Sequence, residues 1–221
     1  MSGKIIVYIR SIFFCFSHLP FKQACKVPIL IGKGVRYKKF KGTVIIKSEH
    51  LHRGMISLGL KQGTYYLSDY QSHLLGGGKI IFKGDSTICA GFRFYVSDEG
   101  ELEIGKGTFM NANTTLSSNT IISIGDYCSF GWNCSLLDWD GHNILNKDGD
   151  IINHAKPIFL ENCCWLSSHC AITKGVVLSH HTIVPYMSVV NKSNSIPYVI
   201  FGGQPNRILK TSIVREDFYN L

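Results

Sequence analysis

The chain has 221 residues, 45% of them hydrophobic and 17% charged, which is long enough for a sizeable core and excludes a disordered polymer. A net charge of +8 would suit nucleic acid, anionic lipid or phosphorylated small molecules as partners. Lys and Arg form no nucleic-acid-binding motif, the densest patch being RYKKFK at 36–41, so we expect no nucleic-acid partner.

The first element is an apolar stretch at residues 4–19, KIIVYIRSIFFCFSHL. Arg10 interrupts it, it is too short and polar to span a bilayer, and no small-residue cleavage site follows. We predict a short helix, amphipathic or packed on the core, that is compatible with contact at a membrane surface. The expected location is cytoplasmic, with the inner face of the membrane as an open alternative.

Aliphatic and other large apolar residues then recur every six positions within four blocks, at 82–94, 104–116, 124–136 and 160–190. A helix would repeat at three and four positions and a strand at two, so a sustained period of six fits neither. We call the residues at these repeating positions the anchors. They are Phe82, Ile88, Phe94, Ile104, Met110, Leu116, Ile124, Phe130, Leu136, Leu160, Leu166, Ile172, Leu178, Val184 and Val190.

A second column of small residues stands four positions after the anchors. We expect each small residue to pack beside an anchor in a narrow interior, which makes four of the eight cysteines buried apolar residues rather than disulfide or metal ligands. The column comprises Thr108, Thr114, Thr120, Cys128, Cys134, Cys164, Cys170, Val176, Thr182 and Ser188.

These columns resemble hexapeptide-repeat proteins, and IGKGTF (104–109) and IGDYCS (124–129) match their unit well. The resemblance implies a mainly β fold, a left-handed parallel β-helix with a short N-terminal helix and a C-terminal capping segment. We expect an N-terminal helix, cap and early β region at 1–78, the β-helix at 79–195 and a capping tail at 196–221. After residue 160 the glycine that usually follows the anchor is missing; glycine often accommodates positive φ, so we expect the turns of the last coils to differ in geometry.

The repeat breaks at 138–157, just after SLLDWDGHNI (135–144). DWDGH begins like a calcium loop, but its glycine falls at the fourth position and no Glu stands at the twelfth. A three-histidine zinc site lacks its His-x4-His spacing. We therefore expect no metal, and two readings remain: a catalytic histidine with acidic support, or a polar turn.

The motifs on both sides of this break narrow the resemblance. IGDYCSFGWNCSLLDWDGHNI, KPIFLENCCWLSSHCAITKGVVL and SVVNKSNSIPYVIFGGQPNRILK resemble, in order and spacing, the sugar O-acetyltransferases of surface-polysaccharide biosynthesis. The match covers about 100–210. It implies acetyl-CoA as donor, a sugar or glycan acceptor, and a homotrimer with sites between neighbouring subunits.

The resemblance places the general base on His142. Histidine suits this role, because its unperturbed pKa lies near neutrality. Asp138 and Asp140 are the candidates to orient it, and we favour Asp138 for support and Asp140 for the acceptor side. Two further groups follow from matching family positions. Donor contacts fall on Trp165, Ser168, Tyr186, Asn191, Lys192, Arg207 and Lys210, and acceptor contacts on Asn111 and Asn133.

Two other functions stay open at this point. The same histidine would serve an N-acetyltransferase acting on an amino nucleotide sugar, and sequence does not separate the two acceptors. A non-enzymatic β-solenoid scaffold is the alternative from a different class. The retained DGH sequence and the basic tail favour the enzyme, because a scaffold needs neither.

Overall fold

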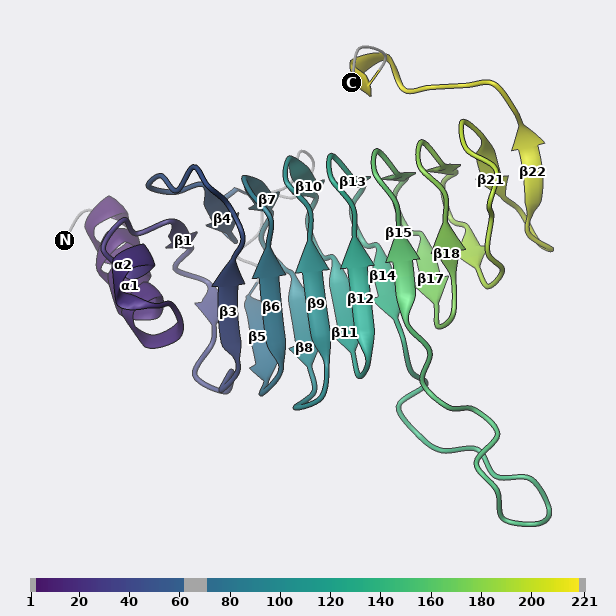
Figure 1. The fold of residues 1–221 in the computed structure, drawn as a ribbon, viewed down its shortest axis with the longest axis horizontal. Helices are drawn as coiled ribbons and strands as arrows, with labels where there is room; N and C mark the ends of the chain where they lie inside the picture. Colours follow the sequence, from purple (N-terminus) through teal and green to yellow (C-terminus); the bar gives the residue numbers. More distant parts are fainter. Residues whose placement is uncertain (1–2, 62–70, 219–221) are drawn as a thin grey trace.

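The computed structural model describes residues 3–61 and 71–218, and it is a three-sided stack of parallel strands (Figure 1). Each coil contributes one strand to each of three sheets, so the strands of one sheet come from successive coils. This is the left-handed parallel β-helix that the resemblance to hexapeptide-repeat proteins implied. We name the sheets A, B and C, and the corners of the coil A–B, B–C and C–A after the sheets they join.

Sheet A has nine strands, of which the last is antiparallel to its neighbour. Its strands, in spatial order, are β1 (Ile29–Ile31), β4 (Ile56–Leu58), β7 (Ser86–Ile88), β10 (Thr108–Met110), β13 (Ser129–Phe130), β16 (Trp165–Leu166), β19 (Ile183–Val184), β21 (Ile200–Gly202) and β22 (Arg207–Lys210).

Sheets B and C have seven and six strands, with all pairs parallel. Sheet B contains β2 (Val35–Arg36), β5 (Ser72–Gly76), β8 (Arg93–Val96), β11 (Thr115–Ser118), β14 (Ser135–Leu137), β17 (Ala171–Thr173) and β20 (Val189–Val190). Sheet C contains β3 (Thr43–Ile46), β6 (Lys79–Phe82), β9 (Glu101–Ile104), β12 (Ile121–Ile124), β15 (Ile158–Leu160) and β18 (Val177–Leu178).

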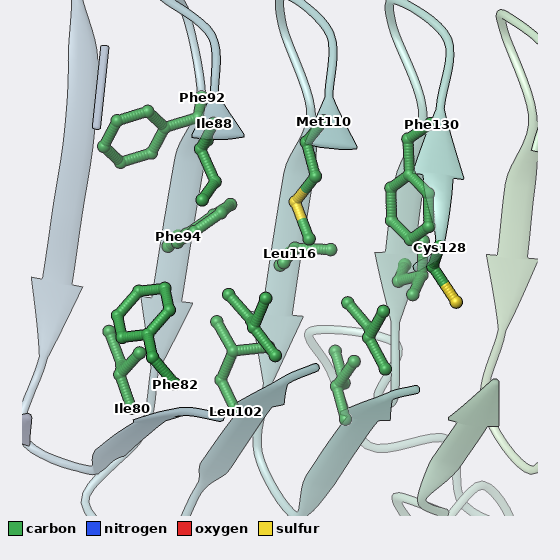
Figure 2. Packing of buried hydrophobic residues seen from close by; sticks show 14 of the residues in the cluster. Ile80, Phe82, Ile88, Phe92, Phe94, Leu102, Met110, Leu116, Cys128 and Phe130 are labelled. Atoms are coloured by element: carbon green, nitrogen blue, oxygen red, sulfur yellow. The ribbon is translucent and has the colours of Figure 1, made fainter. Parts of the chain in front are cut away.

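The predicted anchors form the core. They stack in register between coils, as Ile88, Met110 and Phe130 do along sheet A, and Figure 2 shows the labelled anchors pointing into the interior. All are buried. An outward-facing residue alternates with each anchor, which is the period-two pattern of a strand repeated on three short faces.

The small column is buried as predicted at nine of its ten positions. The four column cysteines are free thiols, and a hydrogen bond with Cys128 together with burial raises the pKa of the Cys164 thiol. Thr120 is the exception and is half-buried, because its hydroxyl turns to the corner and donates to the Asp138 carboxylate at 2.7 Å.

The β-helix begins at β1, about fifty residues before the predicted boundary at 79. The inward-facing Ile31, Ile46, Leu58 and Leu74 belong to the same stacked columns as the later anchors. Connections of unequal length separate these four, so the six-residue period is hidden before residue 79. The early β region is therefore part of the β-helix itself.

The two ends of the stack are covered differently. Helix α1 (Gly3–His18), followed by α2 (Phe21–Ala24), packs across β1, and its Ser11 hydroxyl accepts a hydrogen bond from the Ile31 N–H at 2.9 Å. The other end closes with the antiparallel strand β22, after which the chain runs back along the stack to a short 3-10 helix, η1 (Glu216–Phe218) (Figure 1). Among the described residues, no helix has the length and apolar character needed to cross a bilayer.

The missing glycines are not the residues that carry the left-handed turn conformation. At corners A–B and C–A, the left-handed residue stands three positions after the anchor, as at Gly107, Asn113, Cys163 and His181. The glycine directly after the anchor, such as Gly125, does not have positive φ; its added Cβ would lie 2.6 Å from the Glu161 carbonyl carbon of the next coil. The expected link between that glycine and positive φ was therefore wrong.

Candidate functional site

The interruption at 138–157 is a long hairpin that leaves the stack between β14 and β15, at corner B–C (Figure 1). An antiparallel bridge joins Leu145 to Ile151, and Asn146 closes the tip by accepting hydrogen bonds from the Asp148 and Asp150 N–H groups. All of its residues from 140 to 152 are exposed. The hairpin therefore carries its side chains away from the β-helix, and we call it the 138–157 loop.

Asp138 fixes the point where the loop departs. Its side chain is 0% exposed, and its two carboxylate oxygens accept hydrogen bonds from the N–H groups of Asn119 and Thr120, each at 2.7 Å. The Thr120 hydroxyl adds a third bond. The expected contact between Asp138 and His142 is not found, because the carboxylate is used in holding the corner of the preceding coil.

Asp140 fixes the loop one step further out. Its carboxylate accepts hydrogen bonds from the Lys174 ammonium and, at 2.8 Å, from the Asn153 amide. Lys174 also donates to the Asn153 carbonyl at 2.8 Å, so one cation ties both arms of the hairpin to corner B–C of the next coil. Hydrogen bonding to Lys174, then to Asn153, lowers the pKa of Asp140 below its ordinary value.

His142 is exposed, and the only hydrogen bond recorded for it in the described chain is one from the Asn153 amide to its carbonyl, at 2.8 Å. The imidazole therefore faces solvent on a loop whose stem is fixed on both sides. Neither aspartate contacts the ring. Both acids position the backbone that carries His142, which is a different role from the orienting contact that the sequence suggested.

The Lys174–Asp140 pair yields a testable expectation. Because the folded-state pKa of Asp140 is lowered, its contribution to stability is present above the ordinary carboxyl pKa of about 3.9 and is lost as pH falls through the lowered value. In Lys174→Met we expect the pKa of Asp140 to rise toward that ordinary value, measured by carboxyl-carbon NMR titration.

Amide hydrogen exchange across residues 141–153 should also become faster in Lys174→Met, because the hairpin loses its tie. Lys147→Met is the matched control, since Lys147 lies exposed on the same loop without a recorded acidic partner in the described residues. Equal exchange in the two variants would contradict a role for Lys174 in holding the loop.

The other predicted contacts lie in three further places. Asn111 and Trp165 line one pocket, of about 740 Å³, on the outer side of sheet A, where Arg215 from the tail lies 5.6 Å from the centre of the Trp165 ring. Asn111 is 7% exposed, and its side-chain oxygen accepts the Ala112 N–H at 2.8 Å, so it also holds its own turn.

Asn133, Ser168 and Tyr186 stand at corner A–B of successive coils. His169 joins two of them: its ring lies 3.2 Å from the Asn133 amide nitrogen and 5.4 Å, centre to centre, from the Tyr186 ring. The Ser168 side chain is buried, and its hydroxyl accepts a hydrogen bond from the Trp132 N–H at 3.2 Å. Ser168 therefore stabilises the turn. Tyr186 is 58% exposed.

The remaining predicted contacts lie near the last coil. Asn191 and Lys192 are exposed at corner B–C, the corner that carries the 138–157 loop, and the Asn191 N–H donates to the Asn206 amide oxygen at 2.8 Å. Arg207 and Lys210 are exposed on β22. Within one chain, sheet B separates Asn133, Ser168 and Tyr186 at corner A–B from the loop that carries His142, whereas Asn191 and Lys192 share its corner.

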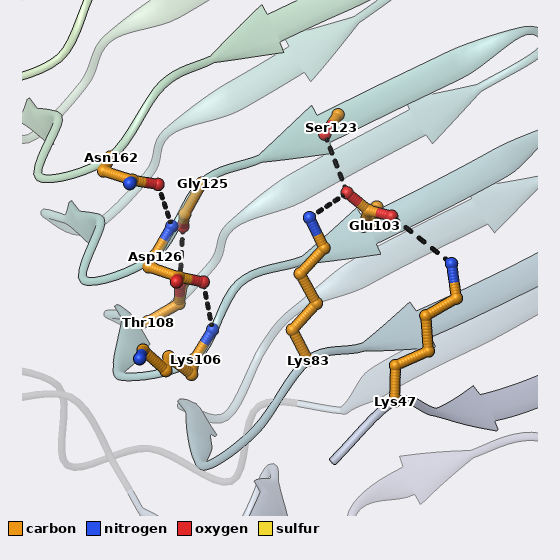
Figure 3. A network of polar contacts seen from close by, with 9 residues as sticks. All are labelled: Lys47, Lys83, Glu103, Lys106, Thr108, Ser123, Gly125, Asp126 and Asn162. Carbon is orange, nitrogen blue, oxygen red and sulfur yellow. Dashed lines mark hydrogen bonds and ion pairs between the residues drawn. The ribbon is translucent and has the colours of Figure 1, made fainter.

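Corner C–A holds a polar cluster that the sequence did not indicate. Figure 3 shows how successive coils are joined there: the Asn162 side chain accepts the Asp126 N–H, and Asp126 accepts the Lys106 N–H. These residues line a pocket of about 680 Å³ with His180 and His181. In the described part of the chain, no three His, Cys, Asp or Glu side chains are grouped to hold a metal ion.

Lys174 and Asn153 hold the base of the 138–157 loop, and sequence reasoning missed both. Lys174 follows an anchor in AITKGVV and Asn153 lies among polar loop residues, so neither spacing nor composition marks them. Their role depends on two corners being stacked, which only the coil geometry shows.

No family model matches the chain. It is 28% identical over 128 residues to the galactoside O-acetyltransferase of Escherichia coli (strain K12), covering 57% of this chain and 61% of that protein. It is 29% identical over 104 residues to the polysialic acid O-acetyltransferase of Neisseria meningitidis, covering 46% of this chain and 48% of that one. The chain thus matches only about half of the length of these relatives.

Solved structures agree over more of the chain. The polysialic-acid-specific acetyltransferase NeuO has a TM-score of 0.56 at 20% identity and covers 88% of this chain and 92% of its own. The N-acyltransferase AntD from Bacillus cereus, solved with dTDP and 3-hydroxybutyryl-CoA, has a TM-score of 0.53 at 16% identity, covering 91% and 92%.

At these identities the solved structures show the fold alone. That fold is the β-helix of the acyltransferases NeuO and AntD. In sequence, this chain is similar to galactoside and polysialic acid O-acetyltransferases.

Proposed function

We propose that the protein is an acetyl-CoA-dependent O-acetyltransferase that acts on a sugar hydroxyl of a surface polysaccharide or its precursor. The observation that carries the proposal is the exposed His142 imidazole on a loop fixed by Asp138 on one side and by Asp140, Asn153 and Lys174 on the other. A histidine in an ordinary solvent-exposed turn would not require a loop whose base is fixed on both sides. The sequence similarity to galactoside and polysialic acid O-acetyltransferases supports the choice of a sugar hydroxyl.

His142 acts as the general base. A ring nitrogen takes the proton of the acceptor hydroxyl as its oxygen attacks the acyl carbon, and the resulting imidazolium returns a proton to the departing sulfur. Acetyl-CoA supplies the acyl group as a thioester. Asp138 and Asp140 act through the loop, holding the histidine backbone where a rigid corner ends.

Basic residues at the last coil suit the donor. Lys192, Arg207 and Lys210 are exposed cations, and phosphate groups of coenzyme A pair with such side chains. Trp165 and Tyr186 offer aromatic surface on sheet A and at corner A–B. In this proposal these residues bind the donor and Asn111 and Asn133 face the acceptor.

The separation of the residues on sheet A and at corner A–B from His142 supports a homotrimer whose sites lie between subunits. Three apolar residues of the 138–157 loop are more than half exposed, namely Ile144, Leu145 and Ile152. A neighbouring subunit would cover them and bring its corner A–B toward the His142 of this chain. A cytoplasmic location fits the eight free thiols.

Release of free thiol from acetyl-CoA tests the proposal against a panel of sugars, nucleotide sugars, amino nucleotide sugars and lipid-linked oligosaccharides. We expect release with hydroxyl acceptors and an acetyl ester in the product, which mild alkali removes. An alkali-stable amide product would instead establish N-acetylation. Absence of thiol release with the whole panel would contradict the enzyme and favour a scaffold.

A further inference from the structure

Charge is divided very unevenly along this chain. The first 48 residues contain ten Lys and Arg and no Asp or Glu, whereas residues 49–221 contain 13 basic and 15 acidic residues. The net positive charge therefore belongs entirely to the N-terminal helices and the first coil. Nine of the ten basic side chains are exposed, and among the described residues only Lys47 lies within 4.0 Å of a carboxylate.

Helix α1 has two faces. One face packs on the stack through Phe14, Cys15 and Ser11, all 0% exposed. The opposite face carries a continuous apolar stripe that α2 extends, with Phe16 and Phe21 in edge contact at 5.8 Å between ring centres. The stripe consists of Ile5 (47% exposed), Ile9 (39%), Phe13 (66%), Phe16 (48%) and Phe21 (73%).

Two basic pockets flank the stripe. Tyr8 and Arg10 lie about 200° apart around the helix, on its opposite sides. The pocket on the Arg10 side measures about 490 Å³ and adds Arg36, Lys38 and Lys39. The pocket on the Tyr8 side measures about 530 Å³ and is lined by Lys4, Lys33 and Arg53, among others.

We propose that this end of the stack, the N-terminal face, docks the protein on a membrane surface rich in anionic phospholipid. The apolar stripe inserts at the boundary between headgroups and acyl chains, and the flanking cations pair with lipid phosphates. The stripe argues against a soluble polyanion as the occupant. A polyanion would bind the cations but would gain no favourable contact with the five exposed apolar side chains between them. The charge argues against a second copy of the same face, because the ten positive side chains of one copy would repel the ten of the other.

Vesicle co-sedimentation tests the proposal independently of acetyl transfer. We expect the full-length protein to sediment with vesicles of equimolar phosphatidylglycerol and phosphatidylcholine at about 0.1 M salt, and to be released at about 0.5 M salt. It should remain in the supernatant with phosphatidylcholine alone. Absence of binding to the anionic vesicles would overturn the proposal.

Two variants separate the contributions. Phe13→Ser/Phe16→Ser should weaken binding at least about tenfold, because two exposed rings leave the interface. Lys38→Glu/Lys39→Glu should weaken it by about fivefold or more for each residue changed. Ile196→Ser/Leu209→Ser is the matched control: its side chains are similarly exposed at the opposite end of the stack, and its binding should equal that of the parent.

The remaining outcomes also decide the question. Binding that survives Phe13→Ser/Phe16→Ser but not the charge reversal would show polyanion recognition and overturn lipid docking. A change in oligomer mass by light scattering, confined to the phenylalanine variant and without vesicle binding, would assign the stripe to self-association. Thermal unfolding of the variants should match the parent, since these side chains are exposed.

Discussion

Replacing His142 with Ala is expected to lower kcat for acetyl transfer by about 10²–10⁴-fold, the usual contribution of a positioned general base. The imidazole is exposed and has no recorded hydrogen bond within the described chain, so its removal leaves no buried group unsatisfied. The free energy of unfolding should therefore change by less than about 0.5 kcal/mol. Thiol release and urea denaturation measure the two quantities.

His154→Ala is the matched control for this expectation. His154 lies on the returning arm of the same loop and is also exposed, so it reports any general effect of removing an imidazole from the hairpin. Its acetyl-transfer rate should equal that of the parent. An unchanged rate in His142→Ala would remove His142 from the chemistry.

Replacing Asp138 with Ala is expected to lower the free energy of unfolding by about 3 kcal/mol. The side chain is completely buried, and its loss leaves the Asn119 and Thr120 N–H groups without their acceptor. The same change releases the base of the 138–157 loop, so activity should fall together with stability. Urea denaturation and thiol release on the same samples measure both.

Asp148→Ala provides the comparison for Asp138. Its side chain is exposed at the tip of the loop, and only its backbone N–H is used, by Asn146. Stability and rate should both remain at the parent values. If Asp138→Ala instead lost activity at full stability, the carboxylate would belong to the acyl-transfer chemistry, as the sequence pattern first suggested.

The residues whose burial was predicted correctly from the sequence are those whose positions follow the six-residue repeat. The six-residue anchor column follows from the length of one face and one turn, so each anchor from Phe82 to Val190 has the same inward environment. The cysteines at 128, 134, 164 and 170 were assigned to the interior by the same rule, and they are buried thiols. The loop at 138–157 was located because it breaks the rule.

The start of the β-helix was missed for the converse reason. Ile31, Ile46, Leu58 and Leu74 stack with the later anchors, yet the segments between them differ in length, and a fixed period does not register them. The turn geometry was also misjudged. The position after the anchor favours glycine for the close approach of the next coil, whereas the left-handed φ falls two residues later, for example at Tyr127 and Met187.

The sequence by itself determined the three-sided β-helix, its inward column and the loop that carries His142, because each depends on neighbours within one coil. Only the tertiary structure decided what the two loop aspartates do. Asp138 and Asp140 are two residues apart in the chain, but their partners are Asn119 and Thr120 on the preceding turn and Lys174 on the next coil. Stacking brings these residues within hydrogen-bonding distance although 18 to 34 positions separate them in the chain, so a local pattern does not show them.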